Sequence, residues 1–216
     1  MEDIENYKVS EKKEKLYLER RSILKNKILG EKTLLTNTCI GGRLYHDYNQ
    51  KFLSPTIDLY IKPKDFVKFC CNLKVYLGYE LVKDENKKIN NFVVAKLNDI
   101  YIYFSHTNYT FEIAKQNWER RKKRINYEDV IVITTDRCTI DESVKRCDAI
   151  TIQEFGNIPY KKVIFTAKEY DYEYCSFLKS FKEERCCPEA TLPAINKKGK
   201  YILETDGFDI DKFILE

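Results

Sequence analysis

The pattern of hydrophobic and polar positions along the chain predicts short strands that alternate with helices. The apolar run at 130–134 is typical of a strand buried on both faces of a sheet and is the predicted central strand, and 162–167 is predicted as another buried strand. The segment 33–38 predicts a shorter strand. Polar and apolar residues alternate from Thr56 to Ile61, which predicts a further strand.

A hairpin and several helices complete the predicted elements. The runs 92–97 and 100–106 flank Asn98-Asp99 and indicate an antiparallel hairpin. Helical spacing is clearest after Pro63, which opens a helix that Gly78 closes. A T-x-x-E capping box opens another helix. The helix with the capping box is predicted for 139–147. Further helices are predicted for 8–29, 110–125 and 172–184.

Strands that alternate with helices, together with one hairpin, indicate an α/β fold of three layers. We expect a mixed, mostly parallel sheet with one antiparallel hairpin. This is a Rossmann-like arrangement without the G-x-G-x-x-G dinucleotide fingerprint. A hairpin or strand is predicted near 200–215. We interpret residues 1–30 as an N-terminal basic helix and residues 31–216 as a single α/β domain.

Composition narrows the class of protein. Of the 216 residues, 43% are hydrophobic and 33% are charged, which predicts an ordered core and excludes a disordered chain. A formal net charge of +4 is too small to indicate a nucleic-acid partner. The chain starts without an apolar stretch, and no apolar run approaches the roughly 20 residues that span a bilayer. We therefore expect a cytoplasmic protein without a transmembrane segment.

The eight cysteines do not indicate a disulfide framework or a zinc site. None of them is part of a C-x-x-C motif, and four of them form the adjacent pairs 70–71 and 186–187, which cannot readily clip loops. In the cytoplasm these thiols are expected to be reduced, and most of them to pack as small core residues.

Polar and flexible residues follow several predicted strands, at the positions where ligands collect in open α/β sheets. If the strand ends meet, these residues line one cleft. In chain order they are Asn37, Cys39, Gly41, Gly42, His106, Asp136 and Arg137. Ser54 lies in the turn before the predicted strand at Thr56, where it either binds a ligand or caps the turn.

Each candidate has a chemical role and a structural alternative. Gly41 and Gly42 either let an anion approach backbone N–H groups or form a tight turn without a ligand. His106 suits a general base near neutral pH, or is a histidine hydrogen-bonded within the fold. Cys39, near a predicted helix N-terminus, is either a reactive thiol or a structural one.

The predicted helix 110–125 places Trp118 and Arg121 on one apolar face. A buried guanidinium needs an acidic partner or a bound anion, so Arg121 indicates one or the other. Asp136 is the candidate partner. Arg120 and Arg124 pair one turn apart on another face, and Arg124 is a second candidate for holding an anion.

The chain resembles the bacterial family called domain of unknown function 1919, whose members are often labelled exopolysaccharide biosynthesis proteins. The resemblance covers about residues 33–167 and rests on TNTCIGGRLYHD (36–47), FLSPTIDLYI (52–61), LNDIYIYFSH (97–106), AKQNWERRKKRIN (114–126) and TTDR (134–137). It implies an α/β fold and a link to cell-surface polysaccharide synthesis. The chain departs from the family pattern after Asp136-Arg137, where Cys138 replaces the usual Asp-Gly.

The resemblance and the candidate residues together suggest a transferase that places an acyl group on a sugar hydroxyl. In this hypothesis, His106 deprotonates the hydroxyl and the N–H groups near Gly41 and Gly42 stabilise the oxyanion. Arg121, Arg124 or Arg137 holds the phosphates of a donor such as a coenzyme A thioester.

Two alternatives stay open. The same residues suit a transferase of a sugar phosphate or polyol phosphate, in which the arginines neutralise the phosphate charge. A different class is a non-catalytic module that binds nucleotide-sugars or partner proteins. In that case the basic N-terminal helix is a contact for a partner or for a membrane surface.

Overall fold

The computed structural model describes nine segments of the chain, and the statements below refer to them. They are residues 18–19, 22–24, 29–86, 92–104, 110–138, 145–178, 193–195, 201–203 and 208–216. Within the predicted N-terminal helix, residues 18–19 and 22–24 are helical, and the rest of that segment up to residue 28 lies outside the described residues.

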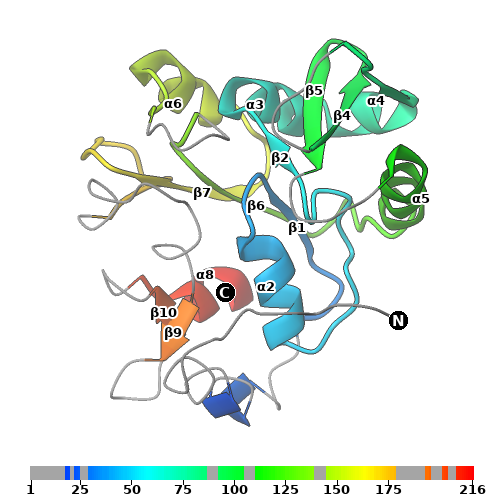
Figure 1. The fold of residues 1–216 in the computed structure, drawn as a ribbon. Helices are drawn as coiled ribbons and strands as arrows, with labels where there is room; N and C mark the ends of the chain where they lie inside the picture. The colour runs from blue at the N-terminus through cyan, green and yellow to red at the C-terminus, as the bar shows by residue number, and fades with distance from the viewer. Residues whose placement is uncertain are drawn as a thin grey trace.

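Four strands form a parallel sheet through the middle of the molecule, in the order β1-β6-β7-β8 (Figure 1). All three strand pairs are parallel. The strands are β1 (Thr33–Thr36), β6 (Val130–Thr135), β7 (Lys161–Thr166) and β8 (Cys175–Phe177). Every residue of β6 is buried, and β6 has a strand on each side. The prediction of a central strand at 130–134 is confirmed.

Alternate residues of these strands enter two separate cores, because successive side chains of a strand point to opposite faces. In β6, Val130 and Val132 enter one core, while Ile131 and Ile133 enter the other. In β1, Leu35 enters the first core and Leu34 the second. The parallel sheet is therefore covered on both faces, as the near-continuous apolar runs in its strands require.

The predicted hairpin exists, but it belongs to a second, antiparallel sheet with the order β2-β5-β4-β3. Its strands are β2 (Tyr60–Ile61), β3 (Leu81–Lys83), β4 (Val93–Leu97) and β5 (Ile100–Phe104). Asn98 has a φ of 55° in the tight turn between β4 and β5. An α/β fold is thus confirmed, but the hairpin expected in the main sheet forms a sheet of its own.

The strand predicted from Thr56 to Ile61 is shorter than expected. Only Tyr60 and Ile61 pair, with Tyr103 and Ile102 of β5. Asp58 has a φ of 62°, in the left-handed region that an extended strand does not enter. The alternation of polar and apolar residues therefore continues through a loop.

Helices lie on both sides of the parallel sheet (Figure 1). In that view, α2 and α8 lie below the parallel sheet, and α3, α6 and the antiparallel sheet lie above it. The helices are α2 (Ile40–Asp47), α3 (Pro63–Cys71), α4 (Leu73–Gly78), α5 (Phe111–Lys122), α6 (Ala149–Phe155) and α8 (Ile210–Leu215).

Two predicted helices are confirmed together with the residues that delimit them. The helix from Pro63 to Gly78 is interrupted only at Asn72, where α3 ends and α4 begins. The helix predicted for 110–125 is α5, and the hydroxyl of Thr110 accepts a hydrogen bond from the N–H of Ile113 at 3.4 Å. This cap satisfies one of the N–H groups that a helix start leaves without an acceptor.

In the carboxyl half of the chain, the predicted helix 172–184 is wrong, and the predicted helix 139–147 is wrong at its end, the part that the structure describes. The segment 172–184 was predicted to be helical, but its residues 175–177 form strand β8. The capping box of the predicted helix 139–147 lies outside the described residues, and residues 145–147 are not helical. A helix, α6, begins instead after Asp148, whose carboxylate accepts from the N–H of Thr151 at 2.7 Å.

The prediction of a hairpin or strand near 200–215 holds only for β10 (Tyr201–Leu203), which pairs antiparallel with β9 (Pro193–Ile195). It is wrong for residues 210–215, which form helix α8. The buried side chains Ile210 and Ile214 of α8 join the core below the parallel sheet.

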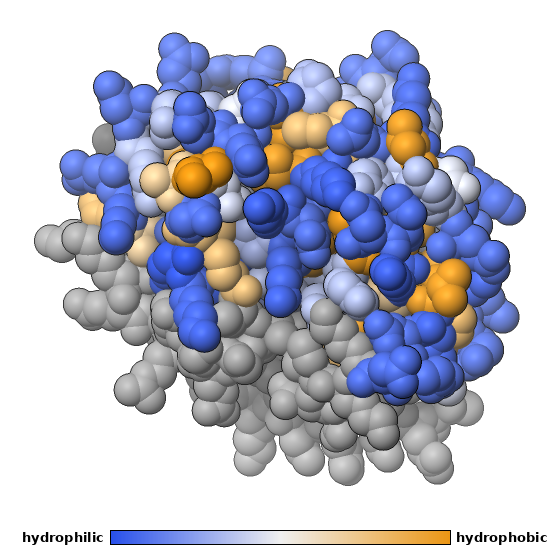
Figure 2. Space-filling view, turned by 90° about the horizontal axis from the view of Figure 1, so that it is seen from above, coloured by the Kyte–Doolittle hydropathy of each residue, from blue (hydrophilic) through white to orange (hydrophobic). Residues whose placement is uncertain are grey.

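The described residues on one face of the molecule form no large apolar patch (Figure 2). The face in Figure 2, which is the top of the molecule in Figure 1, is mostly hydrophilic and carries its hydrophobic residues in small separate patches. Val75, Val82 and Ile150 are more than half exposed. Every helix within the described ranges is too short or too polar to span a bilayer.

Candidate functional site

The carboxyl ends of β1 and β6 meet at Asn37. Its side chain is buried, and its Oδ1 atom accepts a hydrogen bond from the hydroxyl of Thr134 in β6. Its Nδ2 atom donates to the carbonyl of Ile61 in β2 at 3.4 Å. One buried amide therefore joins two parallel strands and the first strand of the antiparallel sheet.

Helix α2 begins directly beyond this point, and Gly41 allows it to pack closely on β1. A methyl group added at Gly41 would lie 2.6 Å from the hydroxyl oxygen of Thr36, well inside contact distance. At Gly42 the same addition would lie 3.3 Å from a methyl carbon of Ile57. Both glycines lie within helix α2 and not in the tight turn of the ligand-free alternative, and close packing gives each a structural reason to be present.

Cys39 occupies the N-cap position of α2. The residue is partly buried and its side chain makes no capping hydrogen bond. The hydroxyl of Thr38 accepts instead from the N–H of Ile40 at 3.4 Å. The thiol thus lies at the helix N-terminus, as predicted, where unpaired N–H groups favour negative charge.

Asp136 ties the end of β6 to β7. One carboxylate oxygen accepts from the N–H of Ala167 at 2.9 Å, and the other accepts from Arg146 at 2.9 Å. Burial raises the pKa of Asp136 above its ordinary value, and these donors partly offset the effect. The expected pairing of Asp136 with Arg121 is wrong, because Arg146 holds this carboxylate.

Arg137 follows Asp136 and is also buried. Its backbone forms an antiparallel bridge with Arg146, and its carbonyl accepts from the hydroxyl of Tyr60 at 3.4 Å. Arg137 is therefore fixed between the end of β6 and the start of β2.

Arg121 lies on the buried face of α5, as the sequence predicted, and its acidic partner is Asp58. Its guanidinium donates to the carbonyl of Ile57 at 2.9 Å and to the carboxylate of Asp58 at 3.2 Å. It also lies over the ring of Phe52, 5.0 Å from the centroid. Its Nε atom is buried and has no hydrogen-bond partner within the described part of the chain.

Arg124 and Ser54 both form hydrogen bonds with residues of the loop 52–58. Arg124 donates to the carbonyl of Phe52 at 3.4 Å. The hydroxyl of Ser54 accepts from the N–H of Thr56 at 3.2 Å, and the hydroxyl of Thr56 accepts from the N–H of Thr36 at 3.0 Å. Ser54 is therefore a buried turn cap, which is the structural alternative for this residue.

The candidates fall into two groups. Those at the carboxyl ends of β1 and β6 are Asn37, Cys39, Gly41, Asp136 and Arg137. Those around the 52–58 loop are Gly42, Ser54, Arg121 and Arg124. The groups are adjacent, because the loop packs on β1 through Thr36 and leads directly into β2, which contacts Asn37.

His106, the candidate base, lies outside the described residues. The chain leaves β5 at Phe104, one residue beyond the pair Tyr103–Tyr60, so this strand end is level with the start of β2. Phe104 is the last described residue before the segment that contains His106.

Sequence reasoning missed Asp58, Thr134 and Arg146, which are partners of predicted residues. Asp58 lies in the segment FLSPTIDLYI (52–61). Its alternating polar and apolar neighbours predicted a strand there, so a loop was not expected. Thr134 ends an apolar run and was counted as a strand residue. Arg146 was assigned to a predicted helix, so nothing in the local pattern indicated its pairing with Asp136.

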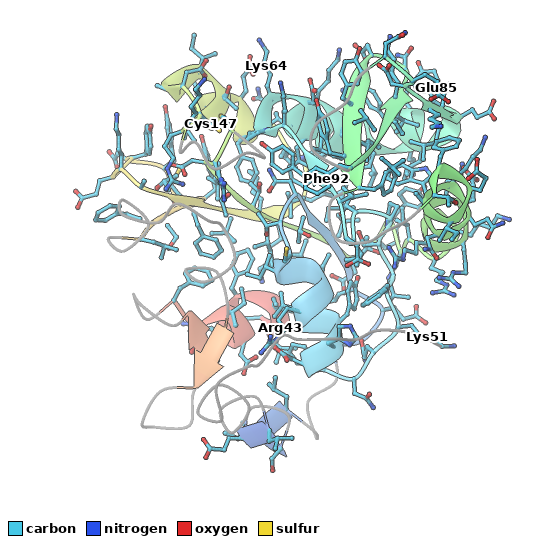
Figure 3. All side chains as sticks on the ribbon, viewed as in Figure 1. Arg43, Lys51, Lys64, Glu85, Phe92 and Cys147 are labelled. Carbon is cyan, nitrogen blue, oxygen red and sulfur yellow. The ribbon has the colours of Figure 1, made fainter. Side chains whose placement is uncertain are left out.

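A hollow of about 580 Å³ lies elsewhere, beside β3 and β4. It is lined by Tyr79, Glu80, Val82, Lys83, Asp84, Glu85, Asn86, Lys96 and Asn98. Glu85 lies well away from Arg43 on α2 in Figure 3, so the hollow is separate from the start of that helix. Among the residues described, no three or more His, Cys, Asp or Glu side chains gather as metal ligands.

Comparison with known proteins identifies the family. The family model described as domain of unknown function (DUF1919) matches residues 6–213. The chain belongs to the DUF1919 family. The match extends beyond residues 33–167, on which the resemblance rested. A relative from Haemophilus influenzae with the name "Uncharacterized protein" is 32% identical over 154 residues, which cover 70% of this chain and 70% of the relative.

Proposed function

We propose that this DUF1919 protein is a cytoplasmic transferase of cell-surface polysaccharide synthesis that places an acyl group on a sugar hydroxyl. The observation that supports a site is the hydrogen bond between Thr134 and Asn37. It joins the carboxyl ends of two parallel strands, and ligands of α/β sheets bind at that edge. Helix α2 starts at the same place, and the first N–H groups of a helix lack intrahelical acceptors.

In this proposal, His106 removes the proton from the acceptor hydroxyl, and the first N–H groups of α2 stabilise the oxyanion. Arg137 directly follows the end of β6 and, in this proposal, holds the phosphates of a donor such as a coenzyme A thioester. The guanidinium groups of Arg121 and Arg124 donate to the 52–58 loop, so we assign them the positioning of that loop.

A non-catalytic module that binds nucleotide-sugars or a protein partner is the second candidate. The observation in its favour is that Asn37, Ser54 and Asp136 are buried and hydrogen-bonded within the protein. Buried groups that are hydrogen-bonded within the protein usually stabilise a fold, which suits a structural role for these residues better than a catalytic one.

A thermal-shift screen of the full chain separates these functions. The compounds are coenzyme A thioesters, nucleotide-sugars and polyol phosphates, each with and without a divalent metal. Our proposal predicts an increase in the melting temperature with coenzyme A thioesters. A metal-dependent increase with polyol phosphates would instead indicate phosphate-group transfer. An increase with nucleotide-sugars alone, without turnover, would indicate the binding module.

The two histidines provide a matched pair of variants for the acyl-transfer assay. His106→Ala should abolish turnover and leave the melting temperature nearly unchanged, because a base acts on substrate and not on packing. His46→Ala is the control, since His46 is exposed on α2 and its ring packs against that of Phe52 in a T-shaped pair. Equal activity of both variants would remove His106 from the mechanism.

A further inference from the structure

Two cysteines meet where the chain leaves β6. Cys138 follows Arg137, and Cys147 follows Arg146 on the segment that leads into α6. Cys147 lies beside α6 in Figure 3. The N–H of Cys138 donates to the carbonyl of Lys145 at 2.7 Å, and the N–H of Cys147 donates to the carbonyl of Asp136 at 2.7 Å. These bonds hold the two backbone segments side by side.

The backbone geometry places the two thiols on one face of this pair of segments. Arg137 and Arg146 are directly opposite each other, and each cysteine is the next residue along its own segment. Successive side chains alternate between faces, so both cysteines point away from the face of the two arginines. Their Sγ atoms are 3.3 Å apart, and both are free thiols.

The two thiols differ in environment. Cys138 is partly exposed, whereas Cys147 is buried. The hydrogen bond between the two thiols lowers the pKa of Cys138, and the same contact together with burial raises the pKa of Cys147. Asp136 and Asp148 oppose the ionisation of both thiols, while Arg146 favours that of Cys138. Cys138 therefore ionises first and is the thiol that solvent reaches.

We propose that Cys138 and Cys147 are a redox-active pair that reacts with low-molecular-weight disulfides. The Cys138 thiolate attacks one sulfur of the small disulfide, forms a mixed disulfide and releases one small thiolate. Cys147 then loses its proton and attacks Cys138, which forms the protein disulfide and releases the second small thiolate. The protein loses two electrons and two protons, and the small disulfide gains them.

This pair is independent of the transferase proposal but affects the same strand edge. The bond would fix residues 136–138 to residues 145–147, and Asp136 and Arg146 already form an ion pair across these segments at 2.9 Å. Reduction removes the covalent tie and leaves the ion pair and the backbone hydrogen bonds. The redox state of the cell would thereby set the rigidity of the carboxyl end of β6.

Peptide mapping of the full chain tests the proposal. The native protein is equilibrated with mixtures of reduced and oxidised glutathione, alkylated and digested with trypsin. The expected product links peptides 138–145 and 147–161, is two hydrogens lighter than the two thiol peptides, and disappears with dithiothreitol. At the same glutathione ratio, it should be at least about tenfold more abundant in native than in urea-unfolded protein, because folding holds the sulfurs together.

Variants identify the role of each thiol. Cys147→Ser should trap glutathione on Cys138, and Cys138→Ser should leave Cys147 unmodified. Cys175→Ser is the control. Cys175 is also a partly buried thiol near Asp136 but does not belong to the proposed pair, so this variant should leave the linked product unchanged. The comparison of native with unfolded wild type needs no variant. Linkage of Cys138 to another cysteine, or equal linkage in native and unfolded protein, would overturn the proposal.

Discussion

The guanidinium of Arg121 lies 3.2 Å from the carboxylate of Asp58, and its side chain is 7% exposed, whereas that of Asp58 is 33% exposed. The pair is therefore asymmetric, with the cation buried and the anion at the surface. Arg121 also holds the carbonyl of Ile57. A helix thus fixes, through one side chain, a loop in which Asp58 has a φ of 62°.

The first prediction concerns this buried cation. Arg121→Ala should lower the free energy of unfolding by about 2–4 kcal/mol, because it removes a buried ion pair, a hydrogen bond and the contact with Phe52. Urea denaturation measures the change. Arg120→Ala, at an exposed position on the same helix, should change the stability by less than about 0.5 kcal/mol. Similar losses for both variants would contradict the structural role of Arg121.

The second prediction concerns the packing of α2 on β1. Gly41→Ala should lower the free energy of unfolding by about 1–3 kcal/mol, because the new methyl group overlaps the side chain of Thr36. Gly78→Ala is the control, since among the described residues no atom beyond its chain neighbours and the backbone of its own helix lies within 4 Å of the added methyl group. It should be neutral or stabilise the protein by up to about 1 kcal/mol. Thr36→Ala should restore part of the loss at Gly41, and no recovery in the double variant would locate the conflict elsewhere.

The third prediction concerns the amide that joins the strand ends. Asn37→Ala should lower the free energy of unfolding by about 1–3 kcal/mol, because Thr134 loses its buried acceptor and Ile61 loses a donor. Chemical denaturation at neutral pH gives the value. Asn157→Ala, at an exposed position after α6, serves as the control and should stay within about 0.5 kcal/mol of wild type. A neutral Asn37→Ala would show that this contact does not hold the sheet edge together.

The fourth prediction concerns pH. Burial raises the folded-state pKa of Asp136 above its ordinary value of 3.8. An acid with a raised pKa binds its proton more tightly in the folded state. Its contribution to stability is therefore complete below pH 3.8 and is lost as the pH rises through the folded-state pKa. The stability of wild type relative to Asp136→Asn should consequently fall as the pH increases across this range.

Denaturation of both proteins at matched pH values gives this difference, and the effects of the other acidic groups cancel. Arg146→Gln should extend the fall to higher pH, because it removes a positive charge that favours the ionised carboxylate. If the stability of wild type relative to Asp136→Asn instead rose with pH, the hydrogen bonds to Asp136 would have a larger effect on its pKa than burial has.

Local patterns in the sequence were sufficient for several elements. The run at 130–134 is apolar throughout, and only a strand with neighbours on both sides buries every side chain. Pro63 and Gly78 delimit a helical segment with residues that suit a helix start and a helix end. In these elements the hydrophobic spacing and the terminal residues indicate the same structure, and tertiary contacts do not change this local preference.

Elements that depend on distant contacts could not be predicted in this way. Residues 175–177 form a strand because they pair with β7, and no local alternation indicates that pairing. Likewise, the partner of Arg121 was assigned to Asp136 because that residue follows a strand, whereas the actual partner precedes Arg121 by 63 residues. The position of His106 relative to these groups remains a prediction from sequence.

The two strands whose ends form the candidate site are neighbours in space but distant in the chain. Lys32, beside β1, and Asp129, beside β6, form an ion pair across 97 residues, and the antiparallel sheet lies between them in sequence. Closure of such a long loop is slow, whereas β3, β4 and β5 pair in consecutive order. We expect the antiparallel sheet to form early during folding and β1 to dock on β6 late. A nascent or partly folded chain would then lack the candidate site entirely, and the activity that we propose for this site would require the last long-range pairing to be complete.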